Sequence, residues 1–244
     1  MYGNFALGYH LIMKDTDRDG LAEYYTDIFD KFGISPSLIL DLGCGAGDIT
    51  YRLAKKGYDM IGLDISPDML NIARAENCHE NILYLNQDMR EFELYGTVDV
   101  IYSSFDCLNY ITDKRDLKKV FALCKNYLNP NGLFIFDINT EFKYKNVLDN
   151  NTFVYDNEKA YLVWQSEYLK KEKICTFYLD MFYKNGEAYE RFYEEQEQRA
   201  YSVEELTKIF SQYGFTALGI YDGMTFKKFK ETSEKIFFVL RKDK

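Results

Sequence analysis

Three glycines follow a carboxylate in the stretch Asp41-Leu-Gly43-Cys-Gly45-Ala-Gly47. Glycines let the backbone turn tightly against a ligand, and they leave the start of the following helix open. A phosphate-binding P-loop would continue with Gly-Lys-Ser/Thr, but Asp48-Ile-Thr follows here. The dinucleotide pattern G-x-G-x-x-G also fails, because its last position is Asp48, whose charge opposes a pyrophosphate. The turn therefore predicts a ligand site, but not a phosphate site.

Two further acids follow later apolar segments. Asp64 lies 21 positions after Gly43, and a carboxylate at the end of a second strand accepts hydrogen bonds from both ribose hydroxyls. Asp88 follows a third segment, where it is placed to accept a hydrogen bond from an adenine amino group, and Met89 offers an apolar packing surface. Asp41 adds an acid near where a positively charged tail would lie. Together these residues describe an adenosine that carries no phosphate.

Alternating strands and helices are expected to position these residues. Apolar segments predict strands at 38–42, 59–66, 82–88, 98–104 and 132–138, and helices separate them. Asp19 is expected to cap an earlier helix that ends at Gly33, and the turn at 129–132 is expected to close the helix at 114–128. Five alternations with short connections predict a mainly parallel sheet with helices on both faces.

The pattern changes between about 142 and 200, where the chain is dense in Tyr, Phe, Glu and Lys. Four alternating segments and the turn Asn185-Gly186 predict an antiparallel unit. A capping box formed by Ser202 and Glu205 then starts a last helix, which two strands follow. We predict an α/β fold: a Rossmann-like, seven-stranded, mostly parallel sheet from residues 1–140 and 201–244, with an inserted antiparallel β lobe at 141–200.

The segments DLGCGAG, GLDIS, NQDMREF, VIYSSFDCLNY and NPNGLFIFDI occur in this order, and the series resembles the class I S-adenosylmethionine-dependent methyltransferases. The resemblance covers residues 36–140 well and 202–244 in outline. It implies S-adenosylmethionine as the cofactor, a bound methionine end at the glycine turn, a ribose at Asp64, and an adenine near Asp88. The residues that it implies for cofactor binding are Tyr9, Asp41, Gly43, Cys44, Gly45, Gly47, Asp64, Ile65, Met69, Asp88, Met89 and Ser103.

The lobe resembles that of small-molecule members of the family, such as glycine N-methyltransferases and amino-sugar N,N-dimethyltransferases, in which it covers the active site together with an aromatic N-terminus. Tyr2, Phe5 and Tyr9 are candidates for such a lid, with an aromatic strip that anchors the core as an equal alternative. The resemblance assigns no catalytic residue, and Tyr9 and Ser104 are only weak candidates. Candidates for contact with the acceptor follow the fourth strand or end the lobe: Asp106, Asn109, Tyr110 and Arg199.

Composition and motifs limit the partners. The chain has 244 residues, and 30 basic against 39 acidic residues give a net charge of −9, which disfavours nucleic acid and anionic membranes. Methylases of exocyclic base nitrogens carry the motif D/N-P-P-Y/F at this position, whereas this chain has Ser103-Ser-Phe-Asp106. The difference disfavours a nucleic-acid substrate. Two distant histidines and five cysteines without a C-x-x-C pair predict no metal site and a cytoplasmic location. The segment 15–20 resembles the first half of a calcium-binding loop. The twelfth position of such a loop is a Glu, but here it is Thr26, so we expect a helix cap and not a calcium site.

We therefore expect an enzyme that methylates a small molecule, with nitrogen slightly favoured over oxygen as the acceptor atom, and that is a monomer or homodimer. Transfer from a sulfonium is an in-line displacement, so alignment matters most and Cys44 is expected to be a turn residue and not a nucleophile. Two alternatives stay open: a methyltransferase that acts on RNA or protein, and a non-catalytic module that binds S-adenosylmethionine. The sequence does not specify the acceptor.

Overall fold

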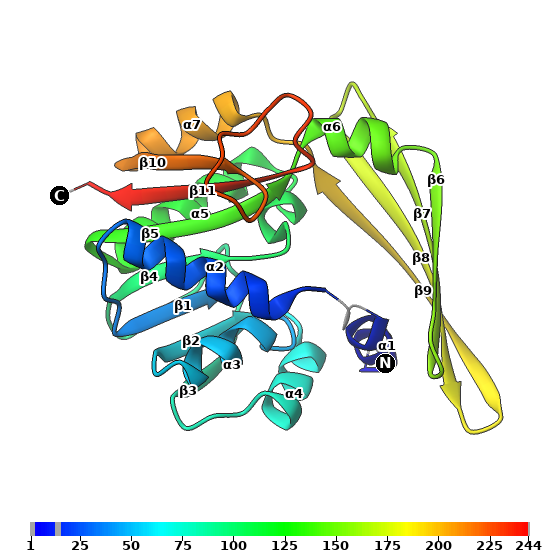
Figure 1. The fold of residues 1–244 in the computed structure, drawn as a ribbon. Coiled ribbons are helices and arrows are strands. Elements are labelled where there is room, and N and C mark those ends of the chain that lie inside the picture. Colours follow the sequence, from blue (N-terminus) through cyan, green and yellow to red (C-terminus); the bar gives the residue numbers. More distant parts are fainter. Residues whose placement is uncertain (1–2, 13–15, 244) are drawn as a thin grey trace.

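The computed structural model describes residues 3–12 and 16–243. It contains two separate sheets, and helix α1 (Gly3–Ile12) lies between them (Figure 1). This helix contacts β7 (Ala160–Leu169) and β8 (Ile174–Asn185) of the smaller sheet and α4 (Pro67–Glu76) beside the larger one. A Cβ atom added to Gly8 would lie 2.9 Å from Met181 Sδ, so the helix approaches the smaller sheet closely at this glycine.

The larger sheet has seven strands in the order β10-β11-β5-β4-β1-β2-β3. Strand β11 is antiparallel to both of its neighbours, and all other neighbouring pairs are parallel. Its strands are β1 (Leu38–Leu42), β2 (Asp59–Asp64), β3 (Ile82–Asn86), β4 (Val98–Ser103), β5 (Leu128–Asn139), β10 (Phe215–Asp222) and β11 (Lys235–Lys242). The helices around it are α2 (Arg18–Lys31), α3 (Asp48–Lys55), α4 (Pro67–Glu76), α5 (Lys114–Tyr127) and α7 (Val203–Gln212), with a short 3₁₀ helix, η2 (Cys107–Tyr110).

Alternation along the strands builds a core on each face of this sheet. Ile39 belongs to one buried cluster with Ile28 of α2 and Leu53 of α3, whereas its neighbour Leu40 belongs to the cluster that includes Val120 of α5. Successive side chains of a strand point to opposite faces, so two adjacent apolar residues serve two cores. This arrangement explains why the strand segments are continuously apolar in sequence, as expected for a parallel sheet covered on both sides.

The smaller sheet is antiparallel, with the order β6-β7-β8-β9. Its strands are β6 (Asn151–Asp156), β7 (Ala160–Leu169), β8 (Ile174–Asn185) and β9 (Ala188–Arg199), and α6 (Glu141–Lys143) and the π-helical turn η3 (Tyr144–Leu148) lead into it. Every second residue of β8 from Cys175 to Met181 is buried, and these residues form one cluster with Ile12 of α1 and Leu148 of η3. This face of the sheet is therefore turned toward the rest of the molecule.

The predicted fold class is confirmed, including the antiparallel sheet, the hairpin turn at Gly186 (φ 65°) and the capping box at Ser202. The predicted cap at Asp19 is wrong, because Asp17 is the N-cap and its side chain accepts a hydrogen bond from the Gly20 N–H. The turn expected at 129–132 lies inside β5 instead, where a register shift against β4 accommodates it. The boundaries 1–140, 141–200 and 201–244 stay a prediction. Among the described helices, none is long and apolar enough to cross a membrane.

Candidate functional site

The glycine turn connects β1 to α3 in left-handed backbone conformations. Gly43, Gly45 and Gly47 have φ values of 87°, 53° and 74°. A Cβ atom on Gly43 would lie 2.7 Å from Cys107 Sγ, and one on Gly47 would lie 2.2 Å from the Tyr84 hydroxyl, so both glycines are required by packing. A Cβ atom on Gly45 would meet nothing within 4 Å. Gly45 therefore borders open space, which is the arrangement expected where a ligand approaches the backbone.

Asp41, near the end of β1, carries an unpaired buried oxygen. Its side chain Oδ2 accepts hydrogen bonds from Thr50 Oγ1 at 2.5 Å and from the Tyr102 hydroxyl at 2.8 Å, whereas Oδ1 has no partner among the described residues. Burial raises the pKa of Asp41 to about 7, although the Thr50 and Tyr102 hydrogen bonds act in the opposite direction. A buried carboxylate oxygen without a donor is costly, so this site favours a cationic ligand group.

Asp64 ends β2 beside the same turn. Its Oδ2 accepts a hydrogen bond from the Gly45 N–H at 2.7 Å, and its Oδ1 accepts one from the Ser66 N–H at 2.8 Å. Burial raises the pKa of Asp64, and these backbone hydrogen bonds partly oppose that effect. Each oxygen of an ionised carboxylate has a further acceptor position, so the carboxylate is fixed in orientation and still able to accept from a diol.

The residues predicted around an adenine have different surroundings. Ile65 is 62% exposed, so its side chain offers an open apolar surface that suits a flat ligand. Met69 and Met89 are half-buried. Asp88 is already engaged, because Arg90 Nε lies 2.9 Å from both of its oxygens and Arg90 holds its pKa below the usual range. Sequence reasoning missed this fork, and the adenine contact of Asp88 stays a prediction.

The remaining predicted cofactor residues are tied into the protein. The thiol of Cys44 is directed at the Gly45 carbonyl oxygen, 3.7 Å away, and burial raises its pKa, so it stays protonated. The Ser103 hydroxyl donates to the Leu42 carbonyl oxygen at 2.7 Å and is fully buried. The Ser104 hydroxyl pairs with the Tyr25 hydroxyl at 2.7 Å.

The predicted N-terminal lid lies partly outside the described residues. Tyr2 and the side chains of Phe5 and Tyr9 lie outside the described residues. The neighbouring His10 is buried, and its ring nitrogens lie 3.6 Å from Asp48 Oδ2 and 3.3 Å from Glu76 Oε2. Helix α1 is thus linked by polar contacts to the ends of α3 and α4, next to the glycine turn.

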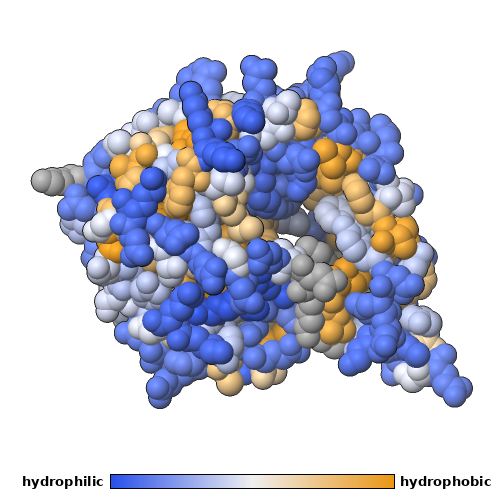
Figure 2. All heavy atoms as spheres, viewed as in Figure 1, coloured by the Kyte–Doolittle hydropathy of each residue, from blue (hydrophilic) through white to orange (hydrophobic). Residues whose placement is uncertain are grey.

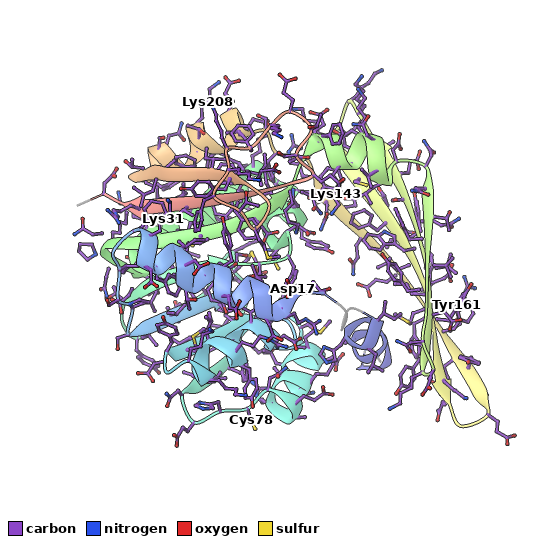
Figure 3. The ribbon with its side chains drawn as sticks, in the orientation of Figure 1. Asp17, Lys31, Cys78, Lys143, Tyr161 and Lys208 are labelled. Atoms are coloured by element: carbon purple, nitrogen blue, oxygen red, sulfur yellow. The ribbon has the colours of Figure 1, made fainter. Side chains whose placement is uncertain are left out.

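A charged network follows the carboxyl end of β4. Lys235 Nζ of β11 lies 2.8 Å from Asp106 Oδ1 and 2.6 Å from Asp137 Oδ2. Gln198 of β9 donates to Asp106 Oδ2 at 2.6 Å. Burial alone would raise the pKa of Asp106, but Lys235 and Lys143 with these hydrogen bonds hold it below the usual range. Lys143 lies between the two sheets (Figure 3), where its Nζ donates to Asn139 Oδ1 at 2.9 Å.

The other candidates for contact with the acceptor either connect elements of the fold or lie at the surface. Asn109 is fully buried, and its amide donates to the carbonyl oxygens of Asn139 and Arg199, so it joins η2, β5 and β9. The Arg199 guanidinium lies over the Tyr201 ring, 5.6 Å from the centroid. The Tyr110 hydroxyl donates to Gln196 Oε1 at 3.0 Å, at the rim. Asp106 and Asn109 are thus both connected to the two sheets, and Asp106 is the one of the two that carries a charge.

The partners of Asp106 in this network were not predicted, and Lys235, Gln198 and Asp137 show why. Lys235 is 129 residues from Asp106 in sequence, and Gln198 lies in another sheet, so neither could be inferred locally. Asp137 did leave a signal, because it is the one acid in the apolar run 133–138.

The surface is concave beside η2 and the smaller sheet. Figure 2 shows the molecule hollowed between the larger sheet and the smaller one. A groove of about 590 Å³ lies where η2 meets the edge strand β9. The residues that line it are Tyr110, Thr112, Thr176, Glu194, Glu195, Gln196 and Glu197.

Comparisons with known proteins agree with this geometry. The methyltransferase domain family matches residues 39–132. A putative methyltransferase, YqeM, of Bacillus subtilis is 33% identical over 246 aligned residues, which cover 100% of this chain and 98% of that protein. A crystal structure of an S-adenosylmethionine-dependent methyltransferase from Clostridium acetobutylicum is 31% identical and superimposes with a TM-score of 0.87, over 100% of this chain and 99% of that one. The chain belongs to the S-adenosylmethionine-dependent methyltransferases.

A methyltransferase of this family uses S-adenosylmethionine, and the residues present fit it. Asp41 Oδ1 lacks a hydrogen-bond donor, and the ammonium group of the methionine end would supply one. Gly45 borders open space, where the ligand could approach the backbone. The sugar N-methyltransferase KedS8 from Streptoalloteichus is 17% identical with a TM-score of 0.80, over 98% of this chain and 93% of that one, and shares the fold.

Proposed function

We propose that this methyltransferase acts on a small-molecule acceptor and that the acceptor atom is nitrogen rather than oxygen. The observation that carries the proposal is the Asp106 network, in which a carboxylate at the end of β4 is kept ionised by Lys235. An ionised carboxylate with a low pKa accepts hydrogen bonds but is a weak base. A neutral amine needs no base to be methylated, whereas a hydroxyl group does.

The chain supplies binding and alignment, while S-adenosylmethionine supplies an activated methyl group. Asp41 would hold the ammonium of its methionine end, Asp64 would hold the ribose hydroxyls, and Ile65 would cover the adenine. Gly45 would let the backbone approach the ligand. Alignment of reacting atoms and exclusion of water are the main contributions expected of the protein in such a displacement.

Placement of the smaller sheet supports a small acceptor. Its inner face, α1 and the carboxyl edge of the larger sheet surround the hollow in Figure 2, which leaves a confined approach. KedS8, which shares the fold, is named a sugar N-methyltransferase. Absence of nucleic acid and membrane partners, a monomeric or homodimeric state and a cytoplasmic location stay predictions.

Turnover of a panel of amines and hydroxy compounds, detected as S-adenosylhomocysteine, tests this function. We expect product from amines and a saturable calorimetric signal for S-adenosylmethionine alone. Methylation of RNA or protein with no small-molecule turnover would contradict the proposal. Binding of the cofactor with no turnover of any acceptor would support the non-catalytic alternative instead.

A further inference from the structure

The turn after β4 has a backbone that ordinary residues seldom adopt. Phe105 and Asp106 are consecutive non-glycine residues with φ values of 56° and 53°. Such conformations persist only where the surroundings impose them, and they are concentrated at functional sites. Here the Asp106 N–H donates to Asp137 Oδ2 at 2.9 Å, while Lys235 and Gln198 hold its two carboxylate oxygens. Side chains from β5, β9 and β11 therefore fix both the backbone and the carboxylate of Asp106.

Fixed in this way, Asp106 still has acceptor capacity to offer. Its side chain is 19% exposed, and each carboxylate oxygen accepts one hydrogen bond, from Lys235 or from Gln198, which leaves further acceptor positions. The adjoining Asp137 is 1% exposed, and its Oδ1 has no hydrogen-bond partner among the described residues. Phe105, the preceding residue, is 37% exposed. A fixed carboxylate with open acceptor positions suits an amino group, because it attracts a partial or full positive charge.

The charge of the groove between η2 and β9 also favours an amine as the ligand. The groove of about 590 Å³ is lined by three carboxylates, those of Glu194, Glu195 and Glu197, and its lining contains no basic side chain. Tyr110, four residues after Asp106, lines the groove and bonds to Gln196. A cleft lined by one sign of charge raises the local concentration of oppositely charged solutes. Most aliphatic amines are ammonium ions in bulk water, so this rim would collect them.

We propose that the acceptor is a basic amine whose nitrogen is held by Asp106 beside Phe105, and that Lys235 is the positioning residue that keeps this carboxylate in place. This inference rests on the proposed methyltransferase function and names its substrate class. The groove at β9 is the approach for the ammonium form, and Asp106 receives the amine.

The chemistry at this position balances without a protein base. The amine reaches the site neutral, having lost its proton to water, and Asp106 accepts a hydrogen bond from its N–H. The nitrogen lone pair forms the N–C bond to the methyl carbon as the C–S bond breaks, and that electron pair stays on sulfur as S-adenosylhomocysteine. The product is a methylated ammonium ion, whose positive charge Asp106 stabilises until it leaves.

Matched acceptor pairs test the substrate class. The probes are amines and their hydroxyl counterparts: glucosamine with glucose, phenethylamine with phenethyl alcohol, and glycine with glycolate. We expect S-adenosylhomocysteine from amines only. Asp106→Asn is expected to lower kcat/KM for the reactive amine at least 30-fold and to weaken its calorimetric binding to the enzyme–S-adenosylhomocysteine complex. The matched control Asp156→Asn, on an exposed residue of β6, is expected to stay within twofold.

The outcomes separate the two proposals. If S-adenosylmethionine fails to bind the wild-type protein, the methyltransferase function itself is contradicted. If it binds but only hydroxyl compounds react, the amine inference is overturned together with the assignment of nitrogen as the acceptor atom, while methyltransferase activity on a small molecule stands. If it binds and no amine reacts, the amine inference is overturned. An Asp106→Asn variant with unchanged amine kinetics would also overturn it. Cofactor affinity is expected to stay within threefold in that variant, which separates a lost acceptor contact from a misfolded protein.

The positioning role of Lys235 has its own test. The groups that face Asp106 are Asp137, Lys143, Lys235, Cys107 and Tyr144, with the neutral Gln198. Removing the ammonium in Lys235→Met is expected to raise the pKa of Asp106, so kcat/KM falls more steeply toward low pH than in the wild type. Lys235→Arg is expected to restore the wild-type profile. A Lys235→Met variant with an unchanged pH profile would contradict the positioning role.

Discussion

The hydroxyl of Tyr102 donates to Asp41 Oδ2 at 2.8 Å, while the other oxygen of the same carboxylate stays buried without a donor. Tyr102 is itself fully buried in the core, so this bond fixes the orientation of the carboxylate. Asp41 Oδ1 is thus a fixed hydrogen-bond acceptor that has no donor within the described residues. Several measurable properties depend on this one carboxylate, because burial raises its pKa to about 7.

Cofactor affinity is predicted to rise with pH between 6 and 8. Only the ionised form of Asp41 pairs with the ammonium group of the methionine end, and with a pKa of about 7 its ionised fraction rises about tenfold over this range. Calorimetry at pH 6, 7 and 8 should therefore show up to about tenfold tighter binding of S-adenosylmethionine. In Asp41→Asn the affinity should be weaker and almost independent of pH. An equally strong pH dependence in that variant would assign the effect to another group.

Stability of the ligand-free protein is predicted to change with pH in the opposite sense. The pKa of Asp41 is higher in the folded state than in the unfolded chain, so the folded state binds more protons between about pH 4 and 7. The stabilising contribution is complete at low pH and is lost as the pH rises through 7, by about 1.4 kcal/mol for each unit of pKa difference. The melting temperature of Asp41→Asn, relative to that of the wild type, should rise from pH 5 to pH 8. A constant difference would refute this assignment.

Asp64→Ala is predicted to weaken cofactor binding by roughly 2–4 kcal/mol, because hydrogen bonds between a carboxylate and the ribose hydroxyls are lost. The substitution also removes acceptors for the Gly45 and Ser66 N–H groups, so the melting temperature must be measured in parallel. Asp59→Ala, on the exposed first residue of the same strand, is the matched control and should bind normally. Unchanged affinity in a folded Asp64→Ala protein would remove the ribose assignment.

Sequence was sufficient for the parts of the fold that local patterns encode. Continuous apolar strands, the glycine turn and the Ser202–Glu205 capping box each depend on residues that are close in the chain, so their order predicted the sheet. The helix cap was misplaced by two residues, because Asp17 and Asp19 are equally good caps by type. Only the backbone conformation decides between them.

The acceptor side of the site was less predictable because its contacts are distant in sequence. Asp106 was a candidate by its place after a strand, yet what defines it is an ion pair with Lys235 and a hydrogen bond from Gln198, more than 90 residues away. Conversely, Arg90 is only two residues from Asp88, yet its guanidinium binds both oxygens of the carboxylate that was predicted to contact the adenine. Residue type and position identified candidates, whereas the partners that tune them came from the tertiary structure.

Two glycines of the same turn are predicted to respond differently to alanine. At Gly45 a methyl group meets no atom within 4 Å, so Gly45→Ala should fold with only the cost of a left-handed alanine, about 1–2 kcal/mol. Its methyl group would project into the space left for the cofactor and should weaken S-adenosylmethionine binding at least tenfold. At Gly47 the methyl would lie 2.2 Å from the Tyr84 hydroxyl, so Gly47→Ala should lower the melting temperature much more. Thermal unfolding and calorimetry on both variants check this. Normal cofactor affinity in Gly45→Ala would mean that the ligand does not approach this backbone.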